Sequence, residues 1–173
     1  MELIDGCFAH GLCFYLKKLN ILAISDTHIG YEESLNKQGI LIPRFQFKEM
    51  LLRIGMAIQE IKQQHKLQKF SKIIINGDLK HEFETISEQE WRHTLRLIDF
   101  LLGYCKELVL IKGNHDAILG PIAGKRGVKI KECHIEGDFL FMHGDKVPDA
   151  GALKAVKTLI IGHEHPAVGI NEG

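Results

Sequence analysis

Several features are scarce in this 173-residue sequence, and each shortage narrows what the protein can be. It has only four cysteines and no CxxC spacing, so we expect reduced thiols rather than a disulfide scaffold. Lysine plus arginine equals aspartate plus glutamate at 22 each, so overall charge cannot drive binding to nucleic acid or to a membrane. Any such binding would need a local patch of charge.

Long apolar runs and targeting signals are not apparent either. No run approaches the roughly 18 apolar residues of a membrane helix, and MELIDGCFAHG carries acids where a signal peptide is basic. We therefore expect a soluble, cytoplasmic protein without a membrane partner. Hydrophobic residues make up 45% of the chain, which is typical of a globular protein. Since no repeat or linker interrupts the sequence, a single domain is expected over residues 1–173.

Hydrophobic periodicity predicts alternating strands and helices. Residues 12–26 should form two strands joined by a turn, and 31–44 an irregular excursion with Gly39 and Pro43 as breakers. A capping box of Ser87 and Glu90 should begin the second helix. The remaining expected elements are helices at 45–65 and 87–105 and strands at 72–76, 107–111, 128–131, 133–136, 138–142 and 157–161. Several of these strands are apolar on both faces, which predicts an α/β fold with a covered sheet.

What the sequence does have is histidine, ten in all, and six follow apolar runs beside aspartate, asparagine or glycine. Five predicted strands end in the same way. The five segments are Ser25-Asp26-Thr27-His28, Gly77-Asp78-Leu79-Lys80-His81, Gly113-Asn114-His115-Asp116, Met142-His143-Gly144-Asp145 and Gly162-His163-Glu164-His165. Each alone has an ordinary explanation as a turn, a helix cap or a structural histidine. Together they indicate a shared site at the carboxyl ends of the strands.

The residue types in these segments suit a site for two metal ions. Carboxylate oxygen, amide oxygen and imidazole nitrogen together bind hard or borderline cations such as Mn²⁺, Fe or Zn²⁺. No cysteine belongs to the set, which argues against a thiolate zinc or iron–sulfur centre. The candidate ligands are Asp26, His28, Asp78, Asn114, His143, His163 and His165.

The segments DTH, GDLKH, GNHD, the isolated His143 and GHEH resemble, in order, the five motifs of the calcineurin-like metallophosphoesterases. DTHIGYEESLNKQGILIPRFQ and GDLKHEF are most similar to small SbcD-related archaeal phosphoesterases and to phosphoesterases associated with DNA ligase. The resemblance implies a four-layer αββα sandwich. Because the chain stops eight residues after His165, we expect either a shortened chain with a shortened second sheet or a partner subunit that covers the exposed edge.

The resemblance also implies a role for each ligand. Asp26, His28 and His165 would hold one metal and Asn114, His143 and His163 the other, with Asp78 between them. The expected cofactors are two divalent ions, manganese first, with iron, zinc or nickel as alternatives. A hydroxide bridging the two metals would attack the phosphorus in line.

Three further residues have expected roles in catalysis. His115 would face the scissile phosphate and stabilise charge or protonate the leaving oxygen. Asp116 would orient His115, with a turn or cap as the alternative. His81 would contact a phosphodiester, as in SbcD-like nucleases, although a histidine at a helix start is the ordinary interpretation.

The expected activity is hydrolysis of phosphodiesters, with DNA as the substrate and a DNA-repair helicase or ligase, or a second copy of the chain, as partner. Two alternatives stay open: a phosphoesterase for small nucleotides or other small phosphate esters, and a non-catalytic scaffold on the same fold. The local basic segment Gly124–Lys131 could bind phosphates, but an exposed basic strand face is the favoured explanation.

Overall fold

The computed structural model describes residues 1–165 and contains two β-sheets. The larger sheet has seven strands in chain order, antiparallel from β1 to β4 and parallel from β4 to β7. Its strands are β1 (Glu2–Ile4), β2 (Cys7–His10), β3 (Cys13–Leu16), β4 (Ile21–Ile24), β5 (Phe70–Asn76), β6 (Cys105–Ile111) and β7 (Lys129–Lys131). The smaller sheet has the order β10-β9-β8, from β8 (Cys133–Glu136), β9 (Phe139–Met142) and β10 (Thr158–Ile160).

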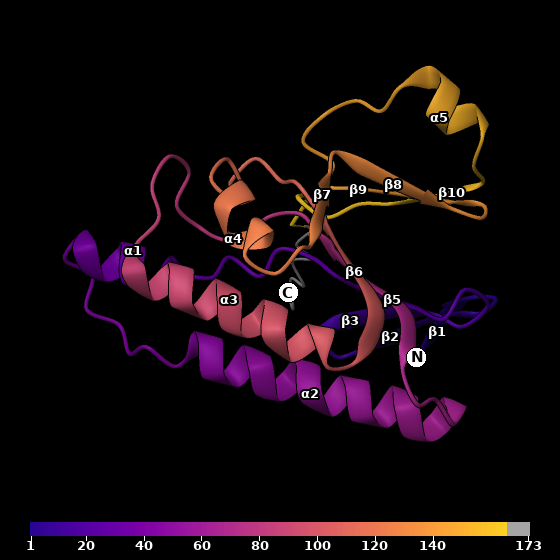
Figure 1. Cartoon of the computed structure of the whole chain (residues 1–173), viewed down its shortest axis with the longest axis horizontal. Coiled ribbons are helices and arrows are strands. Elements are labelled where there is room, and N and C mark those ends of the chain that lie inside the picture. The colour runs from indigo at the N-terminus through magenta and orange to yellow at the C-terminus, as the bar shows by residue number, and fades with distance from the viewer. Residues whose placement is uncertain (166–173) are drawn as a thin grey trace, which may run out of the picture.

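The helices lie outside the sheets (Figure 1). The two long ones run side by side along one face of the larger sheet, and α5 stands at the opposite end of the molecule, next to the smaller sheet. Their bounds are α1 (Tyr31–Lys37), α2 (Gln46–His65), α3 (Glu88–Leu102), α4 (Gly120–Gly124) and α5 (Ala150–Lys154). Within residues 1–165, no helix combines the length and the apolar character that crossing a bilayer requires.

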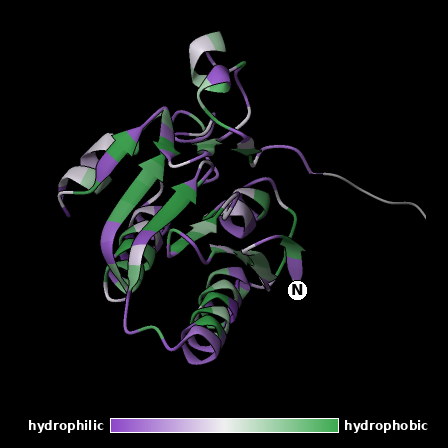
Figure 2. Ribbon diagram, turned by 90° about the vertical axis from the view of Figure 1, so that its right-hand side faces the viewer, coloured by the Kyte–Doolittle hydropathy of each residue, from purple (hydrophilic) through white to green (hydrophobic). Residues whose placement is uncertain are grey.

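Alternating side chains of the central strands fill two separate cores. Ile73 and Ile75 of β5 point toward α2 and α3, whereas Ile74 points toward the smaller sheet, where it joins Phe141 of β9. All four side chains are fully buried, and the central strands are mostly hydrophobic toward their arrowheads in Figure 2. Burial of β5 on both faces requires a layer on each side. The predicted α/β class with two packed sheets is thus confirmed, and the second sheet is the smaller.

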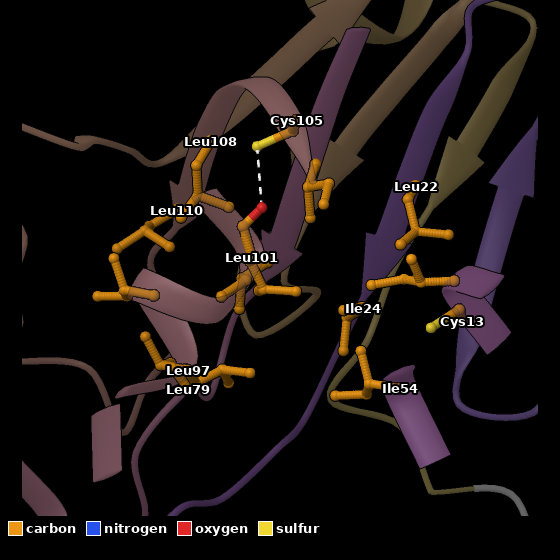
Figure 3. Packing of buried hydrophobic residues seen from close by; sticks show 14 of the residues in the cluster. Cys13, Leu22, Ile24, Ile54, Leu79, Leu97, Leu101, Cys105, Leu108 and Leu110 are labelled. Atoms are coloured by element: carbon orange, nitrogen blue, oxygen red, sulfur yellow. Dashed lines mark hydrogen bonds between the residues drawn. The ribbon is translucent and has the colours of Figure 1, made fainter. Parts of the chain in front are cut away.

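The connection from α3 to β6 shows how closely the helical layer meets the sheet. The thiol of Cys105 donates a hydrogen bond to the carbonyl oxygen of Leu101 at 3.4 Å, drawn in Figure 3. Leu97, Leu108 and Leu110 surround this turn in the same apolar cluster (Figure 3). The helix predicted at 87–105 is α3, and it ends at Leu102 rather than at 105. It ends earlier because Cys105 already pairs with Phe70 in the sheet.

The segment 31–44 was predicted to be irregular, and this is wrong for its first half. Residues Tyr31–Lys37 form α1, which begins after Gly30, a residue in the left-handed region at φ 100°. Glu32 and Glu33 lie in the first turn, where acids interact favourably with the helix dipole. The breaker Gly39 acts only after the helix has ended. The other predicted strands and the helix at 45–65 are confirmed within one or two residues at most ends.

Candidate metal centre

The parallel strands β4, β5 and β6 are neighbours, so their carboxyl ends meet at one edge of the larger sheet. β9 and β10, which are also parallel, end beside this edge. All five histidine-containing segments follow one of these five strand ends. Backbone bonds continue the pairing beyond the strands: the amide of Asp26 donates to the carbonyl of Gly77 at 3.1 Å, and that of His28 to Asp78 at 3.0 Å. The loops that carry the candidate ligands are therefore held in register.

Several of these ligands have a strained backbone. Among the described residues, six that are not glycine have a left-handed φ, and four of the six are candidate ligands: Asp26, His28, Asp78 and His163, at 52°, 40°, 48° and 65°. Such a conformation costs on the order of 1–3 kcal/mol per residue and clusters at functional sites. The turns aim these side chains at one point.

Asp78 lies at the centre of the site and is nearly fully buried. Its Oδ2 is 3.2 Å from Nε2 of His143 and 3.7 Å from Nε2 of His28, and its Oδ1 accepts the backbone N–H of His115 at 3.0 Å. Burial alone would raise the pKa of Asp78, but the hydrogen bonds from His143 and from the His115 amide outweigh it and lower the pKa. Asp78 is therefore ionised and faces imidazoles on both sides.

The candidate ligands form two adjacent groups. In the first group, Asp26, His28 and His165 each place a ligand atom within 4.8 Å of the others. In the second group, Asp78, His143 and His163 do the same. Asn114 joins the second group, since its Oδ1 is 3.0 Å from Nε2 of His143. The structure thus brings together all seven residues that the sequence singled out.

The donor atoms of the second group fit a cation. Nδ1–H of His143 donates to the backbone carbonyl of Asn76 at 3.3 Å, which leaves the lone pair of Nε2 directed at Asn114 Oδ1 and Asp78 Oδ2. Three electron-pair donors that converge repel one another unless a proton or a cation lies between them. In the metal-free chain, burial lowers the pKa of His143, but the contact with Asp78 prevails and raises it.

The donor atoms of the first group also fit a cation. Nδ1 of His28 is buried and has no hydrogen-bond partner among the described residues. Burial, opposed by Asp78, lowers the pKa of His28, so its imidazole is neutral and able to bind a metal. Both groups therefore suit divalent cations with nitrogen and oxygen ligands.

A third cluster, here called the imidazole cluster, consists of His28, His81 and His115, whose ligand atoms also lie within 4.8 Å of one another. The His81 and His115 ring centroids are 5.3 Å apart, and burial lowers the pKa of His81. Two aromatic rings flank the cluster: Tyr31 is 4.8 Å from His81, and Phe83 is 3.7 Å from His115. Sequence reasoning missed Phe83, although its position two residues after His81 was a usable signal.

Asp116 does not make the contact with His115 that was predicted for it. Its buried carboxylate accepts backbone N–H groups of Gly113 at 3.0 Å and of Leu79 and Lys80 at 3.3 Å. A tight turn from Gly113 to Asp116 directs this carboxylate inward, beneath the loops. Burial raises its pKa. Asp116 thus joins the loops after β5 and β6, while Nδ1–H of His115 donates to the carbonyl of His81.

Glycine is required at two places where these loops cross. A Cβ on Gly113 would lie 2.2 Å from Asp78 Oδ1, and a Cβ on Gly77 would lie 2.1 Å from Nδ1 of His143. Neither neighbour is free to move, because each is a buried candidate ligand. Gly113 therefore brings its backbone against the central carboxylate.

Two groups of nitrogen and oxygen ligands lie around one carboxylate at the strand ends of a two-sheet α/β fold, an arrangement that suits a protein with two bound divalent cations. The sequence model of the family described as calcineurin-like phosphoesterase matches residues 19–167, and the chain belongs to this family. No curated protein matches the sequence.

A solved structure of similar fold is a nuclease from Pseudomonas putida, described as nuclease MPE. The two share 18% sequence identity and a TM-score of 0.57 over 90% of this chain and 66% of the nuclease. This chain thus spans slightly less than two thirds of the nuclease's length, and at this identity the likeness concerns the fold.

Proposed function

We propose that this protein hydrolyses phosphodiester bonds and that its substrate is DNA. The observation that carries the proposal is the imidazole cluster. The two ligand groups already contain the histidines that two cations need, so His81 and His115 are additional. Both are partly exposed, beside the central carboxylate Asp78. A phosphodiester carries two ester groups, and only one of them leaves in the reaction. His81, the second partly exposed imidazole, could contact the ester group that stays.

In this proposal the chain's own residues divide the work. Asp26, His28 and His165 hold one cation, and Asn114, His143 and His163 the other, with Asp78 between them. Bound divalent cations would supply positive charge and an activated water for attack on phosphorus. We propose manganese, with iron, zinc or nickel as alternatives.

His115 is proposed as the group that handles the proton of the leaving oxygen. Its Nδ1–H is committed to the carbonyl of His81, so Nε2 is the nitrogen that gains or gives a proton. Nε2 also faces the centre, 3.9 Å from Asp78 Oδ2. As an imidazolium it would donate Nε2–H to the leaving oxygen and stabilise negative charge on the phosphoryl group.

A small nucleotide or other small phosphate ester is the second candidate substrate. It is favoured by the ion pairs that already occupy cations of the basic segment Gly124–Lys131. Arg126 pairs with Asp99 through two bonds, the longer at 2.9 Å. Lys129 lies 3.7 Å from Glu107, which reduces the free positive charge that a DNA backbone could meet. Lys131 is also engaged, with Nζ 2.9 Å from Nδ1 of His134.

The proposal also includes the subgroup of the family to which this chain is most similar. GDLKHEF, with His81 in the imidazole cluster, supports a place among SbcD-related phosphoesterases and those associated with DNA ligase. On this proposal the protein acts in the cytoplasm as one domain, with a DNA-repair helicase or ligase as its partner. A homodimer is the alternative assembly.

The deciding experiment is digestion of end-labelled single- and double-stranded DNA by the manganese-loaded protein, beside bis(p-nitrophenyl) phosphate and p-nitrophenyl phosphate. His115→Ala serves as the inactive control and His81→Ala as the test of the diester contact. We expect cleavage of DNA and of the aryl diester, loss of both in His115→Ala, and selective loss of diester hydrolysis in His81→Ala.

Other results would point elsewhere. Intact DNA with hydrolysis of a small ester would favour the second candidate. Failure to hydrolyse any ester, together with failure to bind two equivalents of metal, would favour a non-catalytic scaffold and overturn the proposal.

A further inference from the structure

Glu90 of α3 is a charged residue without solvent exposure, and its burial needs a reason. The sequence predicted a capping box, and half of it is present: Ser87 Oγ accepts the backbone N–H of Glu90 at 3.0 Å. The carboxylate of Glu90 reaches beyond the helix and accepts two amides of the loop after β5, from His81 at 2.8 Å and from Glu82 at 3.0 Å.

The second of these bonds acts on a particular peptide unit. The N–H of Glu82 and the C=O of His81 belong to the same planar peptide, so fixing the N–H also fixes the direction of the C=O. That carbonyl accepts Nδ1–H of His115. A continuous path of hydrogen bonds therefore runs from α3 through the His81–Glu82 peptide to the ring of His115.

The surrounding backbone is built closely around this carboxylate. A Cβ on Gly30 would lie 2.9 Å from Oε1 of Glu90, so the loop after β4 also packs against it. The amide of His81 donates to the carbonyl of Ile29 at 2.9 Å, which joins the same two loops. Oε2 of Glu90 is buried with no hydrogen-bond partner among the described residues. A residue kept only to cap a helix would not need such a costly location.

We infer that Glu90 is a positioning residue for catalysis: it holds the His81–Glu82 peptide so that the His81 carbonyl fixes the tautomer and orientation of His115. This inference rests on the proposed function, because it deepens the role given to His115. The Glu90 carboxylate is fully buried and belongs to neither ligand group. Its effect should therefore appear in turnover rather than in metal content or substrate affinity.

The test compares Glu90→Ala, which removes the acceptor, with Glu90→Gln, which keeps an oxygen at Oε1. Glu88→Gln, an exposed acid in the same helical turn, is the matched control. With bis(p-nitrophenyl) phosphate we expect Glu90→Ala to lower kcat by about 100-fold with KM within about twofold of wild type, as for a slightly misplaced catalytic group. Glu90→Gln should recover most of the loss, and Glu88→Gln should match wild type.

A double-mutant cycle separates positioning from a general loss of stability. If Glu90 acts through His115, Glu90→Ala should cause little further loss of the residual rate that a high enzyme concentration detects in a protein that already carries His115→Ala. If the double variant instead loses kcat by the product of the two single-variant losses, the inference is overturned. Should Glu90→Ala fail to fold, Glu90→Asp, which keeps the charge but withdraws the carboxylate, takes its place with the same expectation.

A spectroscopic readout keeps this inference distinct from the proposed function. In zinc-loaded protein labelled with ¹⁵N-histidine, Nδ1–H of His115, assigned with His115→Ala, should give a protected proton signal. We expect the signal in wild type and in Glu90→Gln and its loss in Glu90→Ala. An unchanged signal in Glu90→Ala would refute the inference even if the enzyme is active. A protein that hydrolyses no ester but shows the expected signals would refute only the proposed function.

Discussion

The side-chain amide of Asn76 donates a hydrogen bond to the backbone carbonyl of Met142 at 2.9 Å, and this bond crosses from the larger sheet to the smaller one. The same amide lies 3.3 Å from the carbonyl of Ile160. Asn76 also receives Nδ1–H of His143 on its own backbone carbonyl. One fully buried residue thus joins both sheets directly beneath the second ligand group.

Replacement of Asn76 by leucine should affect both stability and metal binding. Loss of the amide leaves the buried Met142 carbonyl and the partly buried Ile160 carbonyl without this donor, which should lower the free energy of unfolding by about 1–3 kcal/mol. The substitution keeps the backbone carbonyl that accepts Nδ1–H of His143 but removes the bond to the Met142 carbonyl next to His143, so metal affinity should fall by about tenfold. Urea unfolding and metal titration measure the two effects. Ser71→Ala, an exposed position on the same strand, is the control, and unchanged metal affinity in Asn76→Leu would contradict the prediction.

Asp78→Asn should disrupt binding at both ligand groups. The substitution keeps the shape but removes the negative charge that faces imidazoles on both sides. We expect the bound metal to fall below two equivalents, and the affinity by at least about tenfold. Elemental analysis after dialysis measures the content, with the exposed Asp138→Asn as the control. A full complement of two metals in Asp78→Asn would show that this carboxylate is not shared.

The metal-free protein should show a pH-dependent contribution from His143. Its pKa in the folded chain is raised from 6.5 by Asp78, so the contribution is fully present below pH 6.5 and is lost as pH rises through the folded-state pKa. The stability difference between wild type and His143→Gln should therefore shrink above pH 6.5. Urea unfolding in EDTA from pH 5 to 9 tests this, and a difference that grows with pH would contradict it.

Thiol reactivity should separate the four cysteines. Burial raises the pKa of Cys7 and Cys105 and raises that of Cys13 to about 12, whereas Cys133 on β8 is exposed. Since the thiolate is the reactive form, iodoacetamide at pH 8 should label one cysteine in the folded protein and four after denaturation. Mass spectrometry counts the labels, and Cys133→Ser should abolish the rapid one. Rapid labelling of a second site in the native protein would count against the described packing.

The basic segment should matter little for any DNA substrate. Arg126 and Lys129 already have acidic partners on the surface, so their joint replacement by alanine should change KM for DNA by less than about threefold. The double variant Lys37→Ala/Lys146→Ala, which removes two other paired cations, is the control. A steep rise in KM together with a flatter salt dependence would instead identify the segment as a phosphate contact.

Much of the fold was predictable because its long elements carry strong periodic signals. The buried residues of α2 include Met50, Ile54 and Ile58, which lie at helical spacing, and KIIIN could form only a strand covered on both faces. The hairpin of β1 and β2 was not predicted, since Glu2–Ile4 is a short, exposed strand with no alternation to detect. The helices α4 and α5, of five residues each, are likewise too short for a periodic signal.

The ligand positions were predictable for a different reason. Carboxyl ends of parallel strands must meet at one edge, so residues that follow such strands gather there whatever the loops do. The hydrogen-bond partners of the Glu90 and Asp116 carboxylates could not be predicted in this way. Both bond to backbone amides of the loop after β5, and those partners depend on how this loop packs in three dimensions. The capping box correctly placed the helix start at Ser87 but did not indicate the loop partners of the Glu90 carboxylate, and the neighbouring His115 was the wrong partner for Asp116.

The left-handed backbone positions have a consequence for protein engineering. Asn20 and Lys66 are not candidate ligands; they lie at a turn and at the end of α2, and their φ angles are 53° and 54°. Glycine tolerates this conformation without strain, so Lys66→Gly should make the protein more heat-resistant by a fraction of a kcal/mol, about 0.5. The same exchange at Asp26 or His163 would relieve equal strain and delete a candidate ligand. Thermal robustness and catalysis therefore compete at some left-handed positions and are independent at others.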